Sequence, residues 1–460
     1  MLRYVAAESD IIVPMVPDRS ARPIRHRDGI PIAPGAFPLV GHAPRLYRDA
    51  IDYYRESRDA LGPLFWSCFG LGTWVLVCTA PESLELLGSR ACGMSHVKQS
   101  APVLIGDGLL GQDGIAHQRM RAALNVPFSP RGLATTRIGV AIADIMARHV
   151  ERWAASGRVT VLAETQALTL EVIFRLIGIE GQDLAAWGRQ YRDFALAMFP
   201  VLPSWIPGSP MWRAVRARRW LDDKLLAIVR AEQSRENSGG FLSEMAHGKD
   251  ERGEPLAHSE LVDNLRLLTI AGHETTAALL AWITIVLAQN PDLWTQLCDE
   301  ANALDALPTT PQEIRACPFA EALFRETLRA YPISPFTGRT VYQPVTLCGH
   351  ALPQGVVVYV ALPLLLRDPA LFPDPERFDV SRWLSRAEPP SPLEVSQFGG
   401  GGHFCLGYHL AWLEAVQFAL TLARHLSRRK LQPRLVGEQT PRHYFLPAGH
   451  PAKGTQIEFV

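Results

Sequence analysis

The sequence predicts a mainly α-helical protein with a small β region, and three observations support this fold class. Apolar residues recur with helical spacing over most of residues 115–330, where prolines and glycines separate the periodic stretches. The longest of these stretches, 259–289, would form a helix of roughly 45 Å at 1.5 Å per residue. Two strand-rich patches, 64–78 and 341–360, supply the β region.

The chain is expected to be one domain preceded by a short extension. Residues 1–30 contain several prolines and arginines and are expected to be a loosely ordered N-terminal extension. Residues 31–460 contain neither a clear repeat nor a clear linker and are expected to form a single domain. Segment 199–212 has four prolines and two tryptophans, which predicts an apolar loop. That loop would either form a binding or membrane-contact surface or fold under as a satellite core.

Composition excludes several classes of protein. Lys+Arg and Asp+Glu both number 46, so the formal charge is zero and the basic footprint of a nucleic-acid binder is missing. The seven cysteines are dispersed without a CxxC pair, which argues against zinc and favours reduced thiols. Apolar runs fall short of the ~18 residues of a spanning helix, and no signal peptide is evident. We therefore expect a cytoplasmic protein without a transmembrane anchor or a nucleic-acid partner.

A glycine-rich loop around Cys405 carries the strongest chemical signal. Four glycines, Gly399 to Gly402, precede the cysteine, and an amphipathic helix from Tyr408 to about Ser427 follows it. Glycines allow close backbone approach, and a helix start favours an anion, so both features are expected to lower the pKa of the thiol. A thiolate bound to haem iron promotes O–O cleavage. A phosphate cradle is disfavoured because neither a P-loop nor a dinucleotide fingerprint is present. A nucleophilic cysteine remains an alternative.

The long predicted helix contains a second chemical motif, Ala271-Gly272-His273-Glu274-Thr275-Thr276. Gly272 removes a side chain where a large flat group could approach, and Thr275 can bond back to the carbonyl of residue 271. Glu274 is a proton source within an otherwise apolar helix. An acid beside an alcohol suits proton delivery to oxygen, although a polar helix face without chemistry is the simpler interpretation of the motif alone.

Taken together, these motifs resemble the cytochrome P450 family. The residues Phe398, Gly401, His403, Cys405 and Gly407 match its haem-binding signature. His403 stands where the family more often has arginine, which weakens one expected propionate contact. The resemblance covers about residues 31–460. It implies a helix-rich prism with a long central helix, a β-sheet patch near the substrate entrance, and haem b with Cys405 as the iron ligand.

The resemblance also implies roles for residues elsewhere. Glu274 and Thr275 would be catalytic, and Ala271, Gly272, Phe398 and Gly407 would contact the cofactor. The haem propionates would be held by His117, Arg121, Arg339 and His403, of which His117 and Arg121 are spaced to project together from one helix. Glu326, Arg329 and Arg377 would form a structural ion cluster behind the thiolate loop.

The regions expected to contact substrate are largely apolar. The residues in question are Val103, Leu104, Leu268, Ile333, Phe336 and Phe445. They predict a hydrophobic or amphipathic small molecule. Arg266 could face a carboxylate, but solvent is the preferred expectation.

The implied reaction is monooxygenation, in which RH, O₂, two electrons and two protons give ROH and H₂O. The substrate would be a lipid, terpenoid, steroid or secondary metabolite that is hydroxylated or epoxidised. Because no flavin or ferredoxin segment is evident, electrons would come from ferredoxin and its reductase or a similar donor, with Arg119 on the receiving face of a monomer. The alternatives are a haem-thiolate isomerase, dehydratase or peroxygenase, a non-enzymatic haem or ligand-binding protein, and a cysteine hydrolase.

Overall fold

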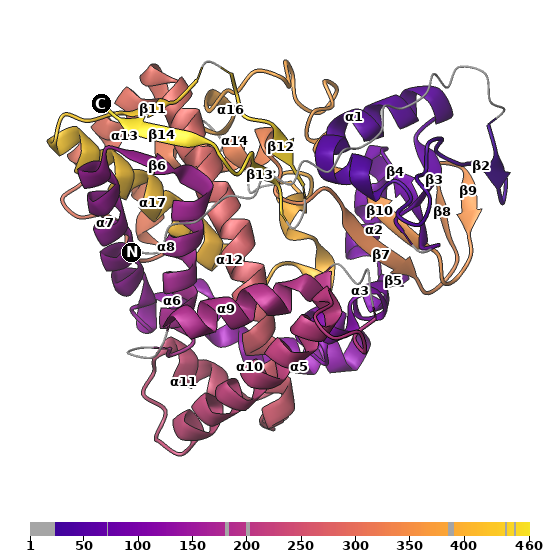
Figure 1. Cartoon of the computed structure of the whole chain (residues 1–460), viewed down its shortest axis with the longest axis horizontal. Coiled ribbons are helices and arrows are strands. Elements are labelled where there is room, and N and C mark those ends of the chain that lie inside the picture. Colours follow the sequence, from indigo (N-terminus) through magenta and orange to yellow (C-terminus); the bar gives the residue numbers. More distant parts are fainter. Residues whose placement is uncertain are drawn as a thin grey trace.

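The computed structural model describes residues 24–70, 72–179, 184–198, 203–384, 391–437, 439–445 and 448–460. Helices make up most of it (Figure 1), and their bounds are α1 (Ala43–Leu61), α2 (Glu85–Gly88), α3 (Ser95–Ser100), α4 (Pro102–Ile105), α5 (Gly114–Phe128), α6 (Pro130–Thr135), α7 (Ile138–Ser156), α8 (Val161–Leu176), α9 (Leu184–Ala195), α10 (Pro210–Gln233), α11 (Phe241–Ala246), α12 (His258–Gln289), α13 (Pro291–Ala303), α14 (Pro318–Ala330), α15 (Leu362–Leu365), α16 (Ser381–Leu384) and α17 (Tyr408–Arg428). The strands are β1 (His26–Arg27), β2 (Ile30–Pro31), β3 (Leu64–Cys68), β4 (Trp74–Cys78), β5 (Cys92–Gly93), β6 (Arg158–Thr160), β7 (Thr337–Val341), β8 (Val345–Leu347), β9 (His350–Leu352), β10 (Val357–Val360), β11 (Pro433–Leu435), β12 (His443–Tyr444), β13 (His450–Pro451) and β14 (Gln456–Phe459).

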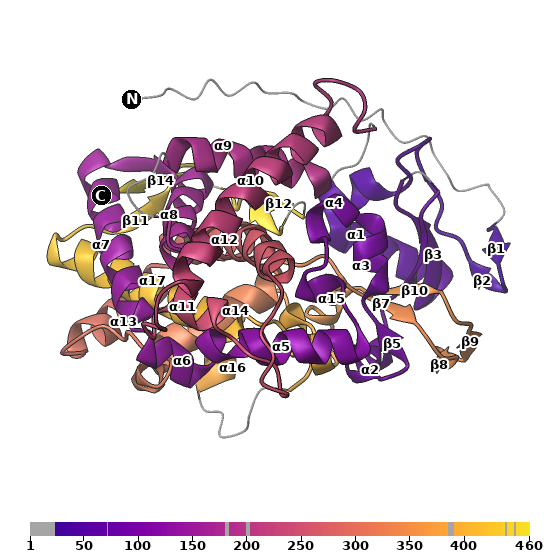
Figure 2. The same cartoon turned by 90° about the horizontal axis from the view of Figure 1, so that it is seen from below.

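Helix α12 runs through the middle of the molecule in both views (Figures 1 and 2) and confirms the long helix expected from the sequence. It begins at His258, one residue before the predicted stretch, and ends at Gln289 as predicted. Trp282 is fully buried, donates from Nε1 to the Gly449 carbonyl at 3.1 Å and stacks on Tyr331. Among the described helices α12 alone is long and apolar enough to cross a membrane, but 67% of its most apolar window is buried, as in the core helix of a globular protein.

The two strand-rich patches of the sequence meet in one five-stranded sheet, ordered β3-β4-β10-β7-β5. The strand-rich patch 64–78 forms β3 and β4, which pair antiparallel. Strand β10 then runs parallel to β4 and antiparallel to β7. Strands β8 and β9 form a separate hairpin. The sheet lies at one side of the molecule, and α12 lies among the helices beside it (Figure 1).

The start of the chain and the segment 199–212 are only partly within the described residues. Residues 1–23 and 199–202 lie outside them. Within the predicted extension, β1 pairs with β2 and Ile30 is buried. Ser209 caps α10 by accepting from the Trp212 amide at 3.1 Å, so the end of the predicted loop is helical. Trp205 is 77% exposed, which fits the surface alternative for that residue.

The expectation that Arg266 faces solvent is wrong. Its side chain is fully buried in α12. The guanidinium forms ion pairs with Asp263, one turn earlier, and with Asp222 of α10. Arg218 of α10 lies 3.4 Å from Asp263 and balances the second negative charge. A buried arginine is tolerated here because carboxylates pair with it.

Gly139, near the start of α7, lies where a side chain cannot fit. A Cβ there would lie 1.8 Å from the Thr309 carbonyl oxygen, a backbone atom, and Gln417 donates to the Gly139 carbonyl at 2.8 Å. We expect Gly139→Ala to lower the free energy of unfolding by about 2 to 3 kcal/mol. The control is Gly188→Ala in α9, where the nearest atom is the flexible end of Arg192 at 3.4 Å and helix propensity favours alanine. Equal urea midpoints for the two variants would contradict this.

Glu414 of α17 makes folding stability depend on pH. It is buried, and burial raises its pKa from 4.5 to about 8. Between these two values the folded protein keeps the proton and the unfolded chain has lost it, so stability should fall as pH rises. In Glu414→Gln the free energy of unfolding should fall over this pH window by at least ~1 kcal/mol less than in the wild-type protein. Urea unfolding at both ends of the window tests it, with the exposed Glu85→Gln as control. An unchanged pH slope in Glu414→Gln would refute it.

Candidate functional site

The loop before α17 is closed by its own backbone. The Cys405 amide donates to the Phe398 carbonyl at 2.8 Å, so the glycine run is held as a compact turn. Gly399 and Gly401 have φ of +76° and +60°, a region that favours glycine. A Cβ on Gly401 would also lie 2.9 Å from the Leu87 carbonyl oxygen. The glycines therefore let the loop turn sharply and press against α2.

The Cys405 side chain is accessible, yet protein atoms surround it closely. Burial raises the pKa of its thiol, while the Gly407 amide and the positive charge of Arg121 oppose that shift. The expectation of a lowered pKa is therefore wrong, since desolvation outweighs both effects. A metal cation bound directly at the sulfur would still favour the thiolate. A Cβ on Gly407 would lie 3.9 Å from the sulfur, in ordinary contact.

Four basic side chains predicted to hold the cofactor carboxylates lie around the loop. Arg121 donates to the Phe404 carbonyl at 2.6 Å, and the imidazoles of His117 and His403 have ring centroids 4.2 Å apart. Arg339 is buried and donates to the carbonyls of Leu87 and Gly400 at 3.1 and 3.2 Å. Burial lowers the pKa of His117 to about 4 and that of Arg339 to about 10. The structure thus brings all four predicted side chains to the same loop.

Sequence reasoning missed an acidic partner of this basic group. The Asp113 carboxylate accepts from His403 Nε2 at 2.8 Å, from the Tyr342 hydroxyl at 2.5 Å and from the Met94 amide at 3.0 Å. These bonds hold its pKa below the usual value, although burial acts in the opposite direction. His403 is therefore fixed by a carboxylate. The only local signal for Asp113 was its place just before α5.

A short stretch of α12 is exposed in the middle of an otherwise buried helix. Ala271 and Thr275 are exposed, whereas residues 276–287 are buried. Because these two side chains are one turn apart, they lie on one face. The Thr275 hydroxyl donates to the Ala271 carbonyl at 2.5 Å, as the sequence predicted. The pattern indicates an opening along this face of α12.

Gly272 and Glu274 lie on the side of α12 that packs against α8. A Cβ on Gly272 would lie 2.8 Å from the Ile173 side chain of α8, so this glycine allows close packing of two helices. Its predicted role of making room for a flat cofactor stays a prediction. Glu274 also faces α8, where its Oε2 accepts from Gln166 Nε2 at 3.0 Å.

The predicted ion cluster is present with one member changed. Arg329 donates to both carboxylate oxygens of Glu326 at 2.9 and 2.8 Å, and both side chains are buried. The expectation for Arg377 is corrected: its side chain is 68% exposed and faces Asp379, and only its carbonyl accepts from Arg329. Arg382 lies 3.5 Å from Glu326 in its place. The backbone carbonyl of Arg377 can accept from Arg329 while the charged side chain of Arg377 stays in solvent, so no further charge has to be buried.

The predicted substrate residues fall into two groups. Leu268, Val103 and Phe336 are half-buried, and Leu268 lies near Gly272 on α12. By contrast Leu104, Ile333 and Phe445 are buried. Phe445 stacks on His443, and Phe336 stacks on Tyr359 at 3.7 Å. The structure does not bring all six to one open surface. The turn near residue 445 is described only in part, since residues 446–447 lie outside the described range.

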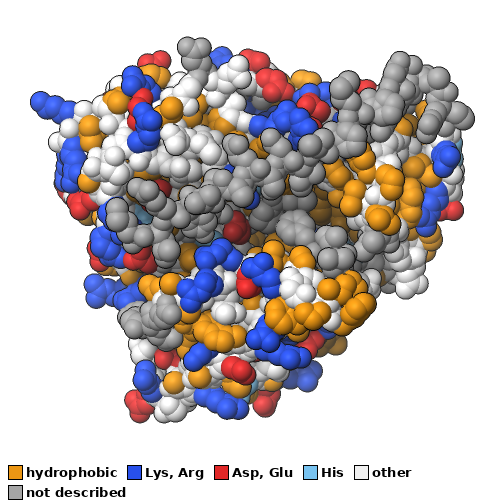
Figure 3. Space-filling model, in the orientation of Figure 1, with side chains coloured by type: hydrophobic (Ala, Val, Ile, Leu, Met, Phe, Trp, Pro, Cys, Tyr) orange, Lys and Arg blue, Asp and Glu red, His pale blue; other side chains and the backbone are white. Residues whose placement is uncertain are grey.

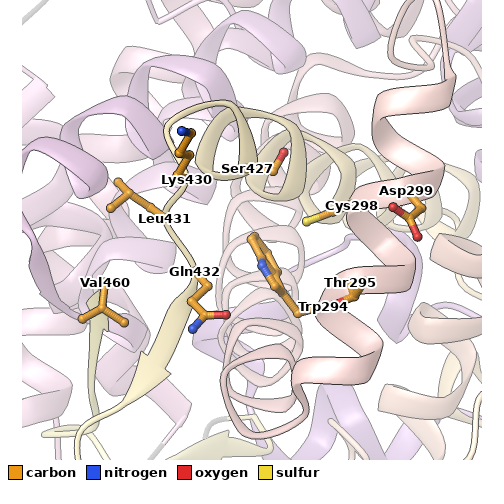
Figure 4. Close-up of a pocket in the computed structure, with 9 residues that line it drawn as sticks. All are labelled: Trp294, Thr295, Cys298, Asp299, Ser427, Lys430, Leu431, Gln432 and Val460. Atoms are coloured by element: carbon orange, nitrogen blue, oxygen red, sulfur yellow. The ribbon is translucent and has the colours of Figure 1, made fainter.

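A surface pocket lies between α13 and the end of α17 (Figure 4) and is separate from this site. Its lining residues are Trp294, Thr295, Cys298, Asp299, Ser427, Lys430, Leu431, Gln432 and Val460. None of them belongs to the predicted chemical motifs, so the pocket gives no reason to move the candidate site.

Comparison with known proteins settles which family the chain belongs to. The family model for cytochrome P450 matches residues 31–457, nearly the whole chain. The chain belongs to the cytochrome P450 family. It is therefore an oxidoreductase of the monooxygenase class with a haem-iron cofactor. The prism-like, helix-rich fold expected from the sequence is confirmed.

Relatives of this cytochrome P450 come from bacteria and from plants. Cytochrome P450 BJ-4 of Bradyrhizobium diazoefficiens is 39% identical over 95% of this chain and 97% of its own length. Cyclooctat-9-en-7-ol 5-monooxygenase of Streptomyces melanosporofaciens is 29% identical over 91% and 93%. A solved cyanobacterial P450 with retinoic acid bound superposes with a TM-score of 0.82 at 25% identity, covering 94% of this chain and 99% of that one.

Proposed function

We propose that this P450 binds haem b through the thiolate of Cys405 and inserts one oxygen atom from O₂ into an apolar small molecule. The observation that carries this proposal is the exposed pair Ala271 and Thr275 in the middle of buried α12, with Glu274 as the adjoining acid. Haem bound at a thiolate supplies O₂ activation. The chain supplies the ligand, the carboxylate contacts and the protons.

The donor set around Cys405 fits haem b. Positive or protonatable groups are His117, Arg121, Arg339 and His403, and among the described residues Asp113 is the acid bonded to this group, through His403. A cofactor with two carboxylates would balance that excess of basic groups. Arg339 and Arg121 also brace the loop through carbonyls of Gly400 and Phe404, so holding the cofactor and shaping the loop depend on the same side chains.

Proton delivery is assigned to Glu274 and Thr275. Glu274 is 27% exposed and can exchange protons with water at the rim of α12. The Thr275 hydroxyl bonds to the Ala271 carbonyl and can turn to pass a proton to oxygen on the exposed face. Two protons are needed for each O₂ that is cleaved to one product oxygen and one water.

The substrate proposed is an apolar molecule of terpenoid or lipid type. Leu268, Val103 and Phe336 are half-buried and supply apolar side-chain surface, and Leu268 belongs to α12 itself. Figure 3 shows hydrophobic side chains gathered on the right-hand side of one face, beside the sheet and below it. The names of two similar proteins, which refer to cyclooctat-9-en-7-ol and retinoic acid, support the same class.

We expect Thr275→Ala to uncouple O₂ consumption from product. The methyl group cannot pass a proton, so product per electron pair should fall about tenfold or more while peroxide rises. The measurement uses holoenzyme with a ferredoxin and its reductase, and a substrate found by its shift of the haem spin state. Thr284→Ala, on the same helix but bonded to the Leu280 carbonyl, is the control. Normal coupling in Thr275→Ala would remove Thr275 from the mechanism.

Electrons are proposed to come from a separate ferredoxin-type donor to a monomeric, cytoplasmic enzyme. The suggestion that Arg119 receives the donor is weakened, because its guanidinium is paired with Glu260. Turnover with peroxide and none with ferredoxin and reductase would instead support a peroxygenase.

A further inference from the structure

We propose that Gln166 of α8 is a positioning residue that holds the carboxylate of Glu274 and controls its supply of protons. The inference rests on the proposed role of Glu274 as the acid of the oxygen-activating pair. It concerns a residue outside every motif that the sequence analysis identified.

The contact between the two helices is direct. Gln166 Nε2 donates to Glu274 Oε2 at 3.0 Å. Ile173, two turns further along α8, lies against Gly272, so the helices approach closely where Glu274 stands. Gln166 is half-buried, which limits competition from water for this bond. An amide donor that points at a carboxylate favours its ionised form and fixes its rotamer.

The other carboxylate oxygen is also restrained. His273 Nε2 lies 3.5 Å from Glu274 Oε1. Its Nδ1 lies 2.9 Å from the hydroxyl of Thr169, a fully buried residue of α8. Burial lowers the pKa of His273, Glu274 raises it, and Arg192 of α9 lowers it further. Side chains of α8 thus hold the acid both directly and through its neighbour.

This arrangement keeps the acid away from the place where a proton is needed. Successive residues of a helix point about 100° apart, so Glu274 and Thr275 leave α12 in different directions. Thr275 lies on the exposed strip with Ala271, whereas Glu274 lies against α8. To deliver a proton to Thr275, the carboxylate must leave Gln166 and return. The Gln166 bond therefore sets the balance between its resting and delivering positions.

Two variants of Gln166 separate this role from a structural one. Gln166→Leu keeps the approximate size and removes the donor at every pH. Gln166→Glu keeps the shape, and two adjacent carboxyl groups can bond only while they share a proton. The matched control is Gln289→Leu at the end of α12, because Gln289 bonds to Thr440 far from the motif.

The test measures product per electron pair in the holoenzyme with ferredoxin and reductase, between about pH 6 and pH 9. Gln166→Leu should lower the product fraction about threefold or more across the range and change the solvent isotope effect. Gln166→Glu should match the wild-type enzyme at the acid end and fall to the level of Gln166→Leu at the alkaline end. Gln289→Leu should behave as wild type. A wild-type product fraction, pH profile and isotope effect in Gln166→Leu would overturn the proposal.

A second readout does not depend on turnover. Protonated carboxyl groups give an infrared band, and the part of it that is missing in Glu274→Gln belongs to Glu274. This band reports the Glu274 side chain in the resting holoenzyme. The frequency of this band should change in Gln166→Leu, because the hydrogen bond from the amide of Gln166 to the carboxyl group is lost. An unchanged frequency would contradict the proposal. If the wild-type enzyme forms no product from O₂, the proposed function fails, and the infrared measurement still decides the role of Gln166.

Discussion

Cys405→Ser is expected to abolish the thiolate-type spectrum of the reduced, CO-bound protein and to lower monooxygenase activity by more than about 1,000-fold. A serine oxygen is a harder and much more basic donor, so it cannot replace the electron donation of a thiolate. The Cys405 sulfur is accessible within a loop that its own backbone closes, so the substitution should leave the fold intact.

The matched control is Cys298→Ser. Cys298 is buried in α13, and its thiol lies 3.9 Å from the Ala423 carbonyl, which a serine hydroxyl can also use. This variant should keep the spectrum and the activity. A thiolate-type spectrum that persists in Cys405→Ser would show that another residue binds the iron.

Arg329→Ala is expected to lower the free energy of unfolding by about 3 to 5 kcal/mol. Its guanidinium donates twice to Glu326 and also to the carbonyls of Leu366 and Pro375 at 3.1 and 2.8 Å. Removing it leaves the buried Glu326 carboxylate with only the more distant Arg382, at 3.5 Å, as a cation, and it takes a donor from the carbonyls of Leu366 and Pro375. Urea unfolding of the holoprotein, followed by circular dichroism, measures the loss.

The control comes from the same helix. Arg325 pairs with Glu321 four residues earlier, but both side chains are partly exposed, so Arg325→Ala should cost less than about 1 kcal/mol. Similar losses in the two variants would show that burial of the Glu326–Arg329 pair does not determine its contribution.

Much of the fold was visible in the sequence because its elements have strong local signals. The helix Pro318–Ala330 begins with one proline and ends two residues before another. Helix α12 was evident from its length and apolar composition. The burial of Arg266 was not, because it depends on Asp222, forty-four residues away on another helix. No local spacing brings these charges together.

In the candidate site too, contacts between residues of one motif could be predicted, whereas contacts between distant residues could not. Residues within one motif, such as His117 with Arg121 or Ala271 with Thr275, could be paired by helical spacing. Asp113 could not be linked to His403, since 290 positions separate them. Gln166 likewise meets Glu274 across 108 positions. Partners of this kind become visible only when the helices and the sheet are assembled.

The order of the sheet has a consequence for how the protein matures. Strand β10 joins β4 although about 280 residues separate them, and β7 joins β5 over a similar span. Long-range pairing of this kind closes slowly, because a large loop must be ordered first. Arg339 belongs to β7 and reaches the carbonyls of Leu87 and Gly400 only in the finished sheet. We therefore expect the nascent chain to capture its cofactor late, after synthesis has passed Cys405.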